Sequence, residues 1–90
     1  MVPGNLAGML WLKDGDVEEN RFGFIISKKI SKRAVDRNRI KRLLSETVKI
    51  NLDKIKSKGN KAVFLAKKTM LGKKTDEVEP EIRKMLEKIK

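Results

Sequence analysis

Apolar and polar residues alternate with a period of two in the first third of the chain, which is typical of half-buried β-strands. Residues 21–27 follow this pattern clearly, with Phe22, Phe24 and Ile26 on one face. Residues 6–13 form a second apolar run, which ends at an Asp-Gly-Asp turn signal. A short acidic loop joins the two runs, so the pattern predicts an antiparallel hairpin.

The period changes from two to that of an α-helix near Arg33 or Ala34. Residues that repeat every three to four positions then gather on one side of a helical wheel: Ile40, Leu43, Leu44, Thr47, Val48, Asn51, Leu52 and Ile55. The amphipathic helix is predicted to run to about Lys58, because Gly59 suits the position that follows a helix.

A third strand and a second helix are predicted in the last third of the chain. Residues 61–67 are apolar enough for a central strand, and residues 68–74 are expected to form a loop. A helix then starts at Thr75 or Asp76, either of which is an adequate N-cap. Acidic residues occupy its first turns, as the helix dipole favours, and Pro80 also lies there.

Ninety residues, of which 39% are hydrophobic and 39% charged, suit one small domain over residues 1–90. The order ββαβα predicts an α+β domain, with helices against one small sheet. No apolar run approaches the roughly 20 residues of a membrane span. No basic n-region precedes the apolar start, so a secretory signal is not expected. Cysteine is absent, which excludes disulfides and thiolate metal sites.

The basic residues are concentrated in one segment. Residues 28–42 contain eight Lys or Arg and one acid, which gives +7 of the chain's net charge of +11. Charge at this density repels itself, so it indicates a polyanionic partner. Nucleic-acid phosphate is the first candidate, an anionic membrane surface the second and an acidic protein the third.

The basic segment also opposes the dipole of the helix that it begins. Only Asp36 agrees with the positive end of that helix, and each misplaced cation costs about 0.3–1 kcal/mol. The cations there are Arg33, Arg37, Arg39, Lys41 and Arg42. A phosphate at the helix start would reverse the sign of the effect, and arginine binds phosphate as a planar fork. We therefore favour an RNA-binding site over an ordinary solvated face.

Candidate chemistry in the protein itself is sparse. The chain has no histidine, so it has no ordinary side chain that titrates near neutral pH. Acids at positions 14, 16, 18 and 19 could be drawn as a metal site, but an acidic hairpin loop is the simpler interpretation. Trp11 is either a core residue or a surface on which a single-stranded base stacks.

Two segments carry a resemblance to a known family. Residues 21–30 read Arg-Phe-Gly-Phe-Ile-Ile-Ser-Lys-Lys-Ile, and residues 34–44 read Ala-Val-Asp-Arg-Asn-Arg-Ile-Lys-Arg-Leu-Leu. In this order and spacing they closely resemble the bacterial ribonuclease P protein component, whose hallmark is R-x-G-x-x-x-S-K-K followed by A-V-x-R-N-R-x-K-R. The resemblance continues through residues 62–68, an apolar strand that ends in a basic loop.

The resemblance implies a cytoplasmic ribonucleoprotein endonuclease that removes 5′ leaders from precursor tRNA. In it the RNA subunit is the catalyst and uses magnesium ions, so no catalytic residue and no protein-only metal site are expected. The implied partners are the catalytic RNA and precursor tRNA, with no membrane and no obligate protein partner. RNA contacts are expected from the motif and its adjoining loops: Lys28, Lys29, Lys32, Arg33, Arg37, Asn38, Arg39, Lys41, Arg42, Lys67 and Lys68.

The resemblance also implies a fold, α-β-β-β-α-β-α, with a small mixed sheet and a left-handed crossover through the basic helix. This chain begins almost at the first strand, so no counterpart of the family's N-terminal helix is expected in it. A further strand is expected within residues 22–31, unless the hairpin is divided differently. Trp11 falls where the family carries an aromatic residue that faces the leader, so it is the candidate leader contact.

Two other functions remain open at this stage. A generic RNA-binding module of the ribosomal type would share the salt-sensitive binding but would not stimulate leader cleavage. A membrane binder would insert the apolar stripe of the basic helix into an anionic surface. That stripe is expected to be needed for the core, which disfavours the membrane alternative.

Overall fold

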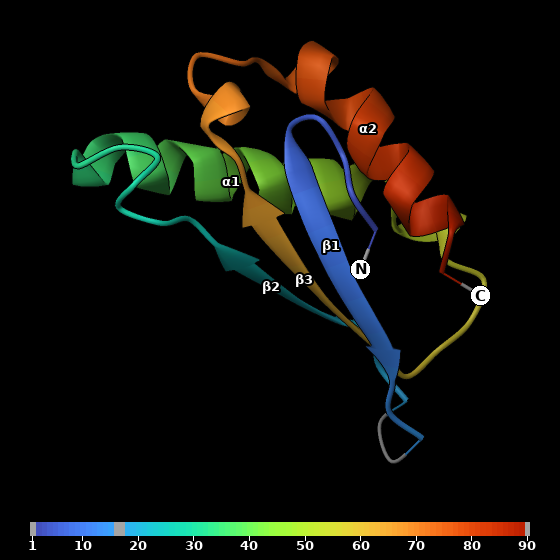
Figure 1. Ribbon diagram of the computed structural model, residues 1–90. Coiled ribbons are helices and arrows are strands. Elements are labelled where there is room, and N and C mark those ends of the chain that lie inside the picture. The colour runs from blue at the N-terminus through green and yellow to red at the C-terminus, as the bar shows by residue number, and fades with distance from the viewer. Residues whose placement is uncertain (1, 16–17, 90) are drawn as a thin grey trace.

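The computed structural model describes residues 2–15 and 18–89. Its described part forms a small α+β domain in the predicted order ββαβα (Figure 1). The elements are β1 (Ala7–Lys13), β2 (Arg21–Ile25), α1 (Ala34–Ile50), β3 (Asn60–Ala66) and α2 (Thr75–Glu87). Two short 3₁₀ turns, Leu52–Lys54 and Lys68–Met70, follow α1 and β3. The predicted fold class is confirmed.

The sheet is mixed, and its strand order is β1-β3-β2. β1 pairs with β3 in antiparallel orientation, whereas β2 pairs with β3 in parallel. The prediction of a β1–β2 hairpin is therefore wrong, and the prediction that the third strand is central is confirmed. The physical reason is burial: β3 carries Phe64, whose side chain is completely buried, and the central position gives that ring the neighbours Met9 and Phe24 in the two flanking strands.

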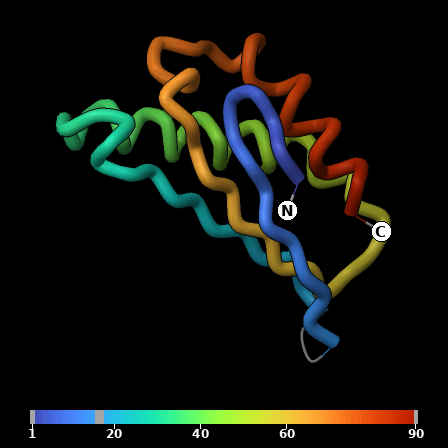
Figure 2. The backbone as a smooth tube through the Cα atoms, viewed as in Figure 1, coloured from blue at the N-terminus to red at the C-terminus, as the bar shows by residue number. Residues whose placement is uncertain are grey.

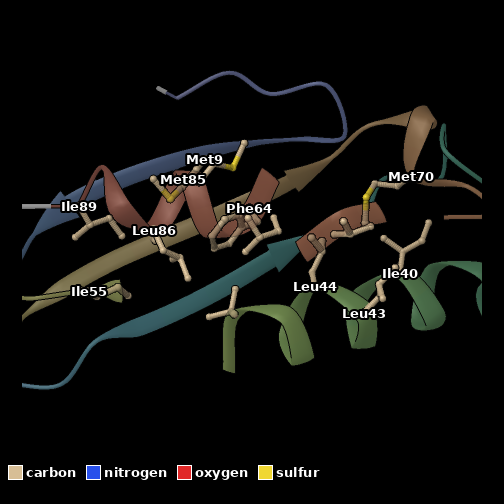
Figure 3. Close-up of a cluster of buried hydrophobic side chains, with 14 of the residues drawn as sticks. Met9, Ile40, Leu43, Leu44, Ile55, Phe64, Met70, Met85, Leu86 and Ile89 are labelled. Atoms are coloured by element: carbon tan, nitrogen blue, oxygen red, sulfur yellow. The ribbon is translucent and has the colours of Figure 1, made fainter. Parts of the chain in front are cut away.

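Both helices pack against one face of the sheet and enclose the core. Met9 and Phe64 project from the sheet toward Leu44 of α1 and Leu86 of α2 (Figure 3). The rings of Phe24 and Phe64 stack with centroids 5.8 Å apart. The predicted inward face of β2 is confirmed, because its aromatic residues pack against this cluster.

The opposite face of the sheet is open. Leu10, Leu12 and Ile25 are 46%, 60% and 53% exposed there. Leu10 lies opposite Val63, and Ile25 lies opposite Leu65, so these apolar residues share one surface. Neither α1 nor α2 covers this face, because both pack on the other side.

Helix α1 is shorter than its apolar pattern predicted. It ends at Ile50, and Asn51 is its C-cap. The amide Nδ2 of Asn51 donates to the carbonyl oxygen of Thr47 at 2.9 Å, which fixes the last turn. Leu52 starts a 3₁₀ turn and is exposed, although the helical wheel placed it in the core. Gly59 does have a positive φ of 73°, but it precedes β3 and caps no helix.

The N-cap of α2 and the segment after β2 also differ from the predictions. Helix α2 starts at Thr75 as expected, but the residue at its N-cap is Lys74. Pro80 lies six residues into this helix. The further strand expected within residues 22–31 is not formed, since β2 ends at Ile25 and the following residues are coil and turn.

The N-terminal segment folds back from β1 and lies beside α2, as the tube in Figure 2 shows. Val2 pairs with Met9 in an isolated antiparallel bridge. The carboxylate of Glu81 on α2 accepts three backbone N–H bonds from residues 5, 6 and 7, at 2.7, 2.9 and 3.0 Å. Helix α2 therefore holds the start of the chain against the domain.

Candidate nucleic-acid interface

Parallel pairing of β2 and β3 brings basic segments from distant parts of the chain to one end of the molecule. Both strands finish at the same edge of the sheet, and Ile25 lies opposite Leu65 there. The loop after β2 leads into the N-terminus of α1, and β3 leads into the 3₁₀ turn beside it (Figure 1). We call the eleven predicted RNA-binding residues at this end the basic end: Lys28, Lys29, Lys32, Arg33, Arg37, Asn38, Arg39, Lys41, Arg42, Lys67 and Lys68.

The basic end is open to solvent. Ten of its eleven side chains are exposed, and Arg37 is half-buried. Exposed cations keep their hydration and remain able to contact an anion. No residue of the basic end therefore serves the hydrophobic core, which is consistent with a binding role.

The loop between β2 and α1 is fixed at both ends of its lysine pair. Ile30 is buried in the core and anchors the loop. Its backbone N–H donates to the carbonyl oxygen of Ser27 at 3.0 Å. The N–H of Lys29 donates to the Ser27 hydroxyl at 3.1 Å. A tight turn thus holds Lys28 and Lys29 outward on a short, anchored segment.

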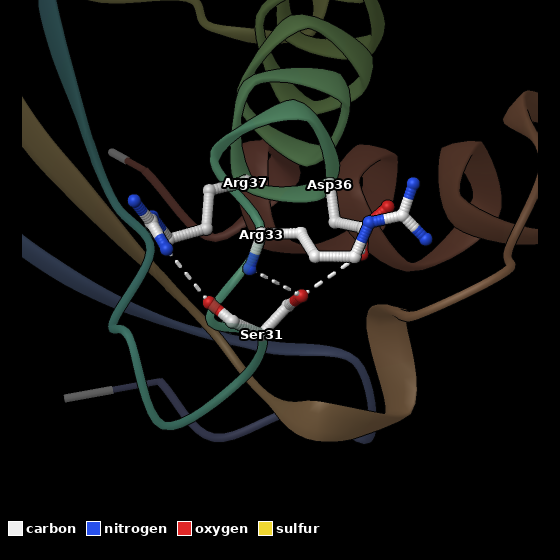
Figure 4. A network of polar contacts seen from close by, with 4 residues as sticks. All are labelled: Ser31, Arg33, Asp36 and Arg37. Atoms are coloured by element: carbon white, nitrogen blue, oxygen red, sulfur yellow. Dashed lines mark hydrogen bonds and ion pairs between the residues drawn. The ribbon is translucent and has the colours of Figure 1, made fainter.

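Four residues form a polar network at the start of α1 (Figure 4). The Ser31 hydroxyl donates to Asp36 Oδ2 at 2.9 Å and accepts the backbone N–H of Arg33 at 3.2 Å. Arg37 Nη1 donates to the Ser31 carbonyl oxygen at 2.8 Å. Arg33 Nε lies 3.8 Å from Asp36 Oδ2. The single acid of the basic segment therefore joins the loop to the helix.

A second group of cations meets between α1 and the start of α2. A shallow pocket of about 270 Å³ lies there, lined by Arg39, Arg42, Lys74 and Glu46, among others. Arg39 Nη2 donates to the carbonyl oxygen of Lys73 at 2.9 Å. Sequence reasoning missed Lys74 as a neighbour of these arginines. No local signal could have found it, because only the packing of α1 against α2 brings it there.

The two lysines after β3 differ in their contacts. The ammonium of Lys67 donates to the Gly4 carbonyl oxygen, and its backbone N–H donates to Leu6 O at 2.9 Å. Lys67 therefore also holds the N-terminal segment. Lys68 begins the 3₁₀ turn and is exposed. Their contact with RNA stays a prediction.

Trp11 lies apart from the basic end. It pairs with Ala62 near the start of β3, whereas the basic end adjoins the finish of that strand. Its ring packs against the core on the helix-covered face, and Nε1 donates to Asn60 Oδ1 at 2.9 Å. This placement supports the core alternative for Trp11, and its contact with a leader stays a prediction.

The acidic loop adds no chemistry among the described residues. Asp14 is paired with Lys61 at 2.9 Å, and Asp16 lies outside the described residues. Within residues 2–15 and 18–89, no group of three acids is arranged to hold a metal ion. None of the helices in these ranges is long and apolar enough to span a bilayer.

Together these features define a small α+β protein that presents a basic end suited to nucleic-acid phosphate. Comparison with known proteins then identifies its family. The family model for ribonuclease P matches residues 4–90, so the chain belongs to the ribonuclease P protein family. This confirms the resemblance found in the two motif segments.

Relatives named ribonuclease P protein component cover most of the chain. The protein from Alkaliphilus oremlandii is 35% identical over 90% of this chain and 69% of its own length. The protein from Clostridium botulinum strain Loch Maree is 39% identical over 77% of this chain and 61% of its own length. The chain thus spans about two thirds of the length of these relatives.

Solved structures support the fold. The ribonuclease P protein from Thermotoga maritima matches with a TM-score of 0.86, over 99% of this chain and 82% of its own. That from Staphylococcus aureus matches with a TM-score of 0.80, over 94% and 75%. Both are 22% identical to this chain, so they bear on the fold alone.

Proposed function

We propose that this chain is the protein subunit of a bacterial-type ribonuclease P, which assists the catalytic RNA in removing the 5′ leader from precursor tRNA in the cytoplasm. Membership of the ribonuclease P protein family supports the role in this endoribonuclease. The basic end is the surface that we assign to the catalytic RNA. The subunit needs no membrane and no obligate protein partner for this role.

The observation that carries the proposal is the basic start of α1. Cations crowd the positive end of this helix and remain exposed, although they oppose its dipole. Phosphate bound there would interact favourably with both the cations and the helix N-terminus. A structured RNA presents phosphates at the density that this arrangement requires.

The basic end does not fit a magnesium ion held by the protein. Mg²⁺ prefers carboxylate and other oxygen ligands, and the only acid of residues 28–42, Asp36, is already bonded to Ser31. We therefore assign magnesium and the hydrolysis itself to the RNA subunit. The protein's contribution in this proposal is to neutralise RNA phosphates near those ions and to fix the RNA's position.

A generic RNA-binding module is the second candidate, and the family match does not favour it. The membrane alternative is weaker still. Ile40, Leu44 and Val48 of α1 are buried in the core, so the apolar stripe of this helix is not free to insert into a bilayer. Neither alternative function predicts that the protein accelerates cleavage of precursor tRNA.

The test is cleavage of a 5′-leader precursor tRNA by a bacterial ribonuclease P RNA at low magnesium, with and without the protein. We expect the protein to accelerate cleavage, because it replaces part of the charge neutralisation that magnesium otherwise supplies. Tight, salt-sensitive binding without acceleration would reduce the role to RNA docking. Neither binding nor acceleration with a cognate RNA would overturn the proposal.

A further inference from the structure

Asp36 is an exception in the basic segment that calls for an explanation. It is the only acid among residues 28–42, and its negative charge weakens the attraction of this segment for phosphate. Its position in the first turn of α1 suits the helix dipole, and its side chain is one third exposed. Its contacts point to a further role, because they reach both the preceding loop and a neighbouring arginine.

We propose that Ser31 and Asp36 form a latch that positions Arg33 and Arg37 for binding to the catalytic RNA, so that Asp36 strengthens RNA binding despite its charge. Asp36 is a positioning residue in this sense, since it acts through the two arginines. The inference rests on the proposed function, because it assigns a role within the RNA-binding surface.

The first part of the latch binds the backbone N–H of the N-cap residue. Arg33 is the N-cap of α1, and its own side chain does not cap the helix. The Ser31 hydroxyl accepts the Arg33 N–H and at the same time donates to the Asp36 carboxylate. One hydroxyl thereby ties the loop backbone to the first turn of the helix.

The second part of the latch orients the two arginine side chains. Arg37 Nη1 donates to the carbonyl oxygen of Ser31, and Arg33 Nε faces Asp36 Oδ2 at 3.8 Å. The side chain of Arg33 is 76% exposed, so this carboxylate restricts a group that would otherwise move freely. A long side chain that is already ordered loses less conformational entropy when it binds.

Positioning and simple electrostatics predict opposite signs for the removal of Asp36. If the basic end is only a dense positive charge, then Asp36→Ala raises the net charge by one and tightens binding to every polyanion. If Asp36 positions the arginines, then the same change weakens binding to the catalytic RNA. Ser31→Ala leaves the net charge unchanged. If the latch positions the arginines, this variant also weakens binding to the catalytic RNA.

The experiment measures dissociation constants of the full chain for a bacterial ribonuclease P RNA and for polyuridylate at one salt concentration. Ser31→Ala and Asp36→Ala are compared with two matched controls, Ser45→Ala on the exposed side of α1 and Asp53→Ala. Asp53 is 74% exposed, and its ion pair joins it only to the adjacent Lys54. Thermal unfolding of each variant is recorded in parallel.

We expect Ser31→Ala and Asp36→Ala each to weaken binding to ribonuclease P RNA by about tenfold, the effect of losing a hydrogen bond to a charged group. Binding to polyuridylate should be unchanged or tighter. The double variant should lose less than the sum of the two single losses, because both single changes remove the Ser31–Asp36 hydrogen bond. Ser31→Thr keeps the hydroxyl, so it should bind ribonuclease P RNA as tightly as the wild type.

Two results would overturn the latch. One is that Asp36→Ala binds ribonuclease P RNA as tightly as the wild type does, or that it gains as much affinity as the control Asp53→Ala. The other is an equal loss of affinity for both polymers together with a lower melting temperature, which would make the two residues merely structural. Failure of the wild-type chain to bind the RNA at all would instead overturn the proposed function.

Discussion

At the scale of single residues, several polar side chains hold segments that their sequence neighbourhood does not connect. Asn60 is fully buried, accepts a hydrogen bond from Trp11 Nε1 and donates from Nδ2 to Asn20 Oδ1 at 2.9 Å. Glu81 accepts three backbone N–H groups of the N-terminal segment. An isolated Asn or Glu in the sequence gives no sign of such a role, because its partners lie far along the chain.

Glu81→Gln provides a test of this role at the residue level. The amide keeps one acceptor oxygen but places an NH₂ group against backbone donors, so we expect stability to fall by about 1–3 kcal/mol. Glu79→Gln is the matched control on the same helix, since Glu79 forms an ion pair with Arg83 at 3.5 Å and its loss should cost about 0.5 kcal/mol or less. Urea unfolding measures both, and equal losses would contradict the assignment.

At the scale of elements, the start of α1 combines a binding surface with a local conflict. The arginines oppose the helix dipole, yet two of them also make backbone contacts: Arg37 with the Ser31 carbonyl and Arg39 with the Lys73 carbonyl. The hydrogen bonds stabilise the start of α1, whereas the positive charges of the arginines oppose the helix dipole and destabilise it. The proposed RNA-binding role gives a reason for cations at this position that the helix dipole does not.

We expect the double variant Arg37→Ala, Arg39→Ala to lose RNA binding with little change in stability. Two lost hydrogen bonds, each contributing about 0.5–1.5 kcal/mol, are partly offset by a dipole term of about 0.3–1 kcal/mol for Arg37, which lies at the end of the first turn. Filter binding to ribonuclease P RNA and thermal unfolding measure the two effects. A large loss of stability with intact binding would show that the arginines are structural.

At the scale of the whole molecule, the mixed sheet gathers the cations. Because β2 and β3 are parallel, the loop with Lys28 and Lys29 and the loop with Lys68 leave the sheet at one edge, beside the start of α1. The predicted hairpin would have placed β2 beside β1 and not beside β3. The basic end is thus a product of topology as much as of composition.

Dependence on salt tests the basic end as a unit. If it neutralises about six phosphates, the logarithm of the RNA affinity should fall against the logarithm of salt concentration with a slope of about −4 to −5. A titration between low and physiological salt measures this slope. A slope near zero would refute phosphate contact, whatever the behaviour of single variants.

The sequence by itself determined the local features of this protein. An apolar run predicted β1, alternating residues predicted β2, and the change of period placed the start of α1 correctly. The dense cations of residues 28–42 marked the surface that we propose for RNA binding. The motif segments also predicted the family correctly. These properties depend on residues close together in the chain, so a linear pattern contains them.

Only the tertiary structure decided the properties that depend on distant partners. The position of β3 between β1 and β2, the end of α1 at Ile50 and the packing of the partly buried Trp11 against the core all follow from contacts across the fold. So do the neighbours of the basic end, such as Lys74 beside Arg39. A strand's own pattern shows which face is buried but not which strand lies next to it, because the free energy of pairing comes from the shared core.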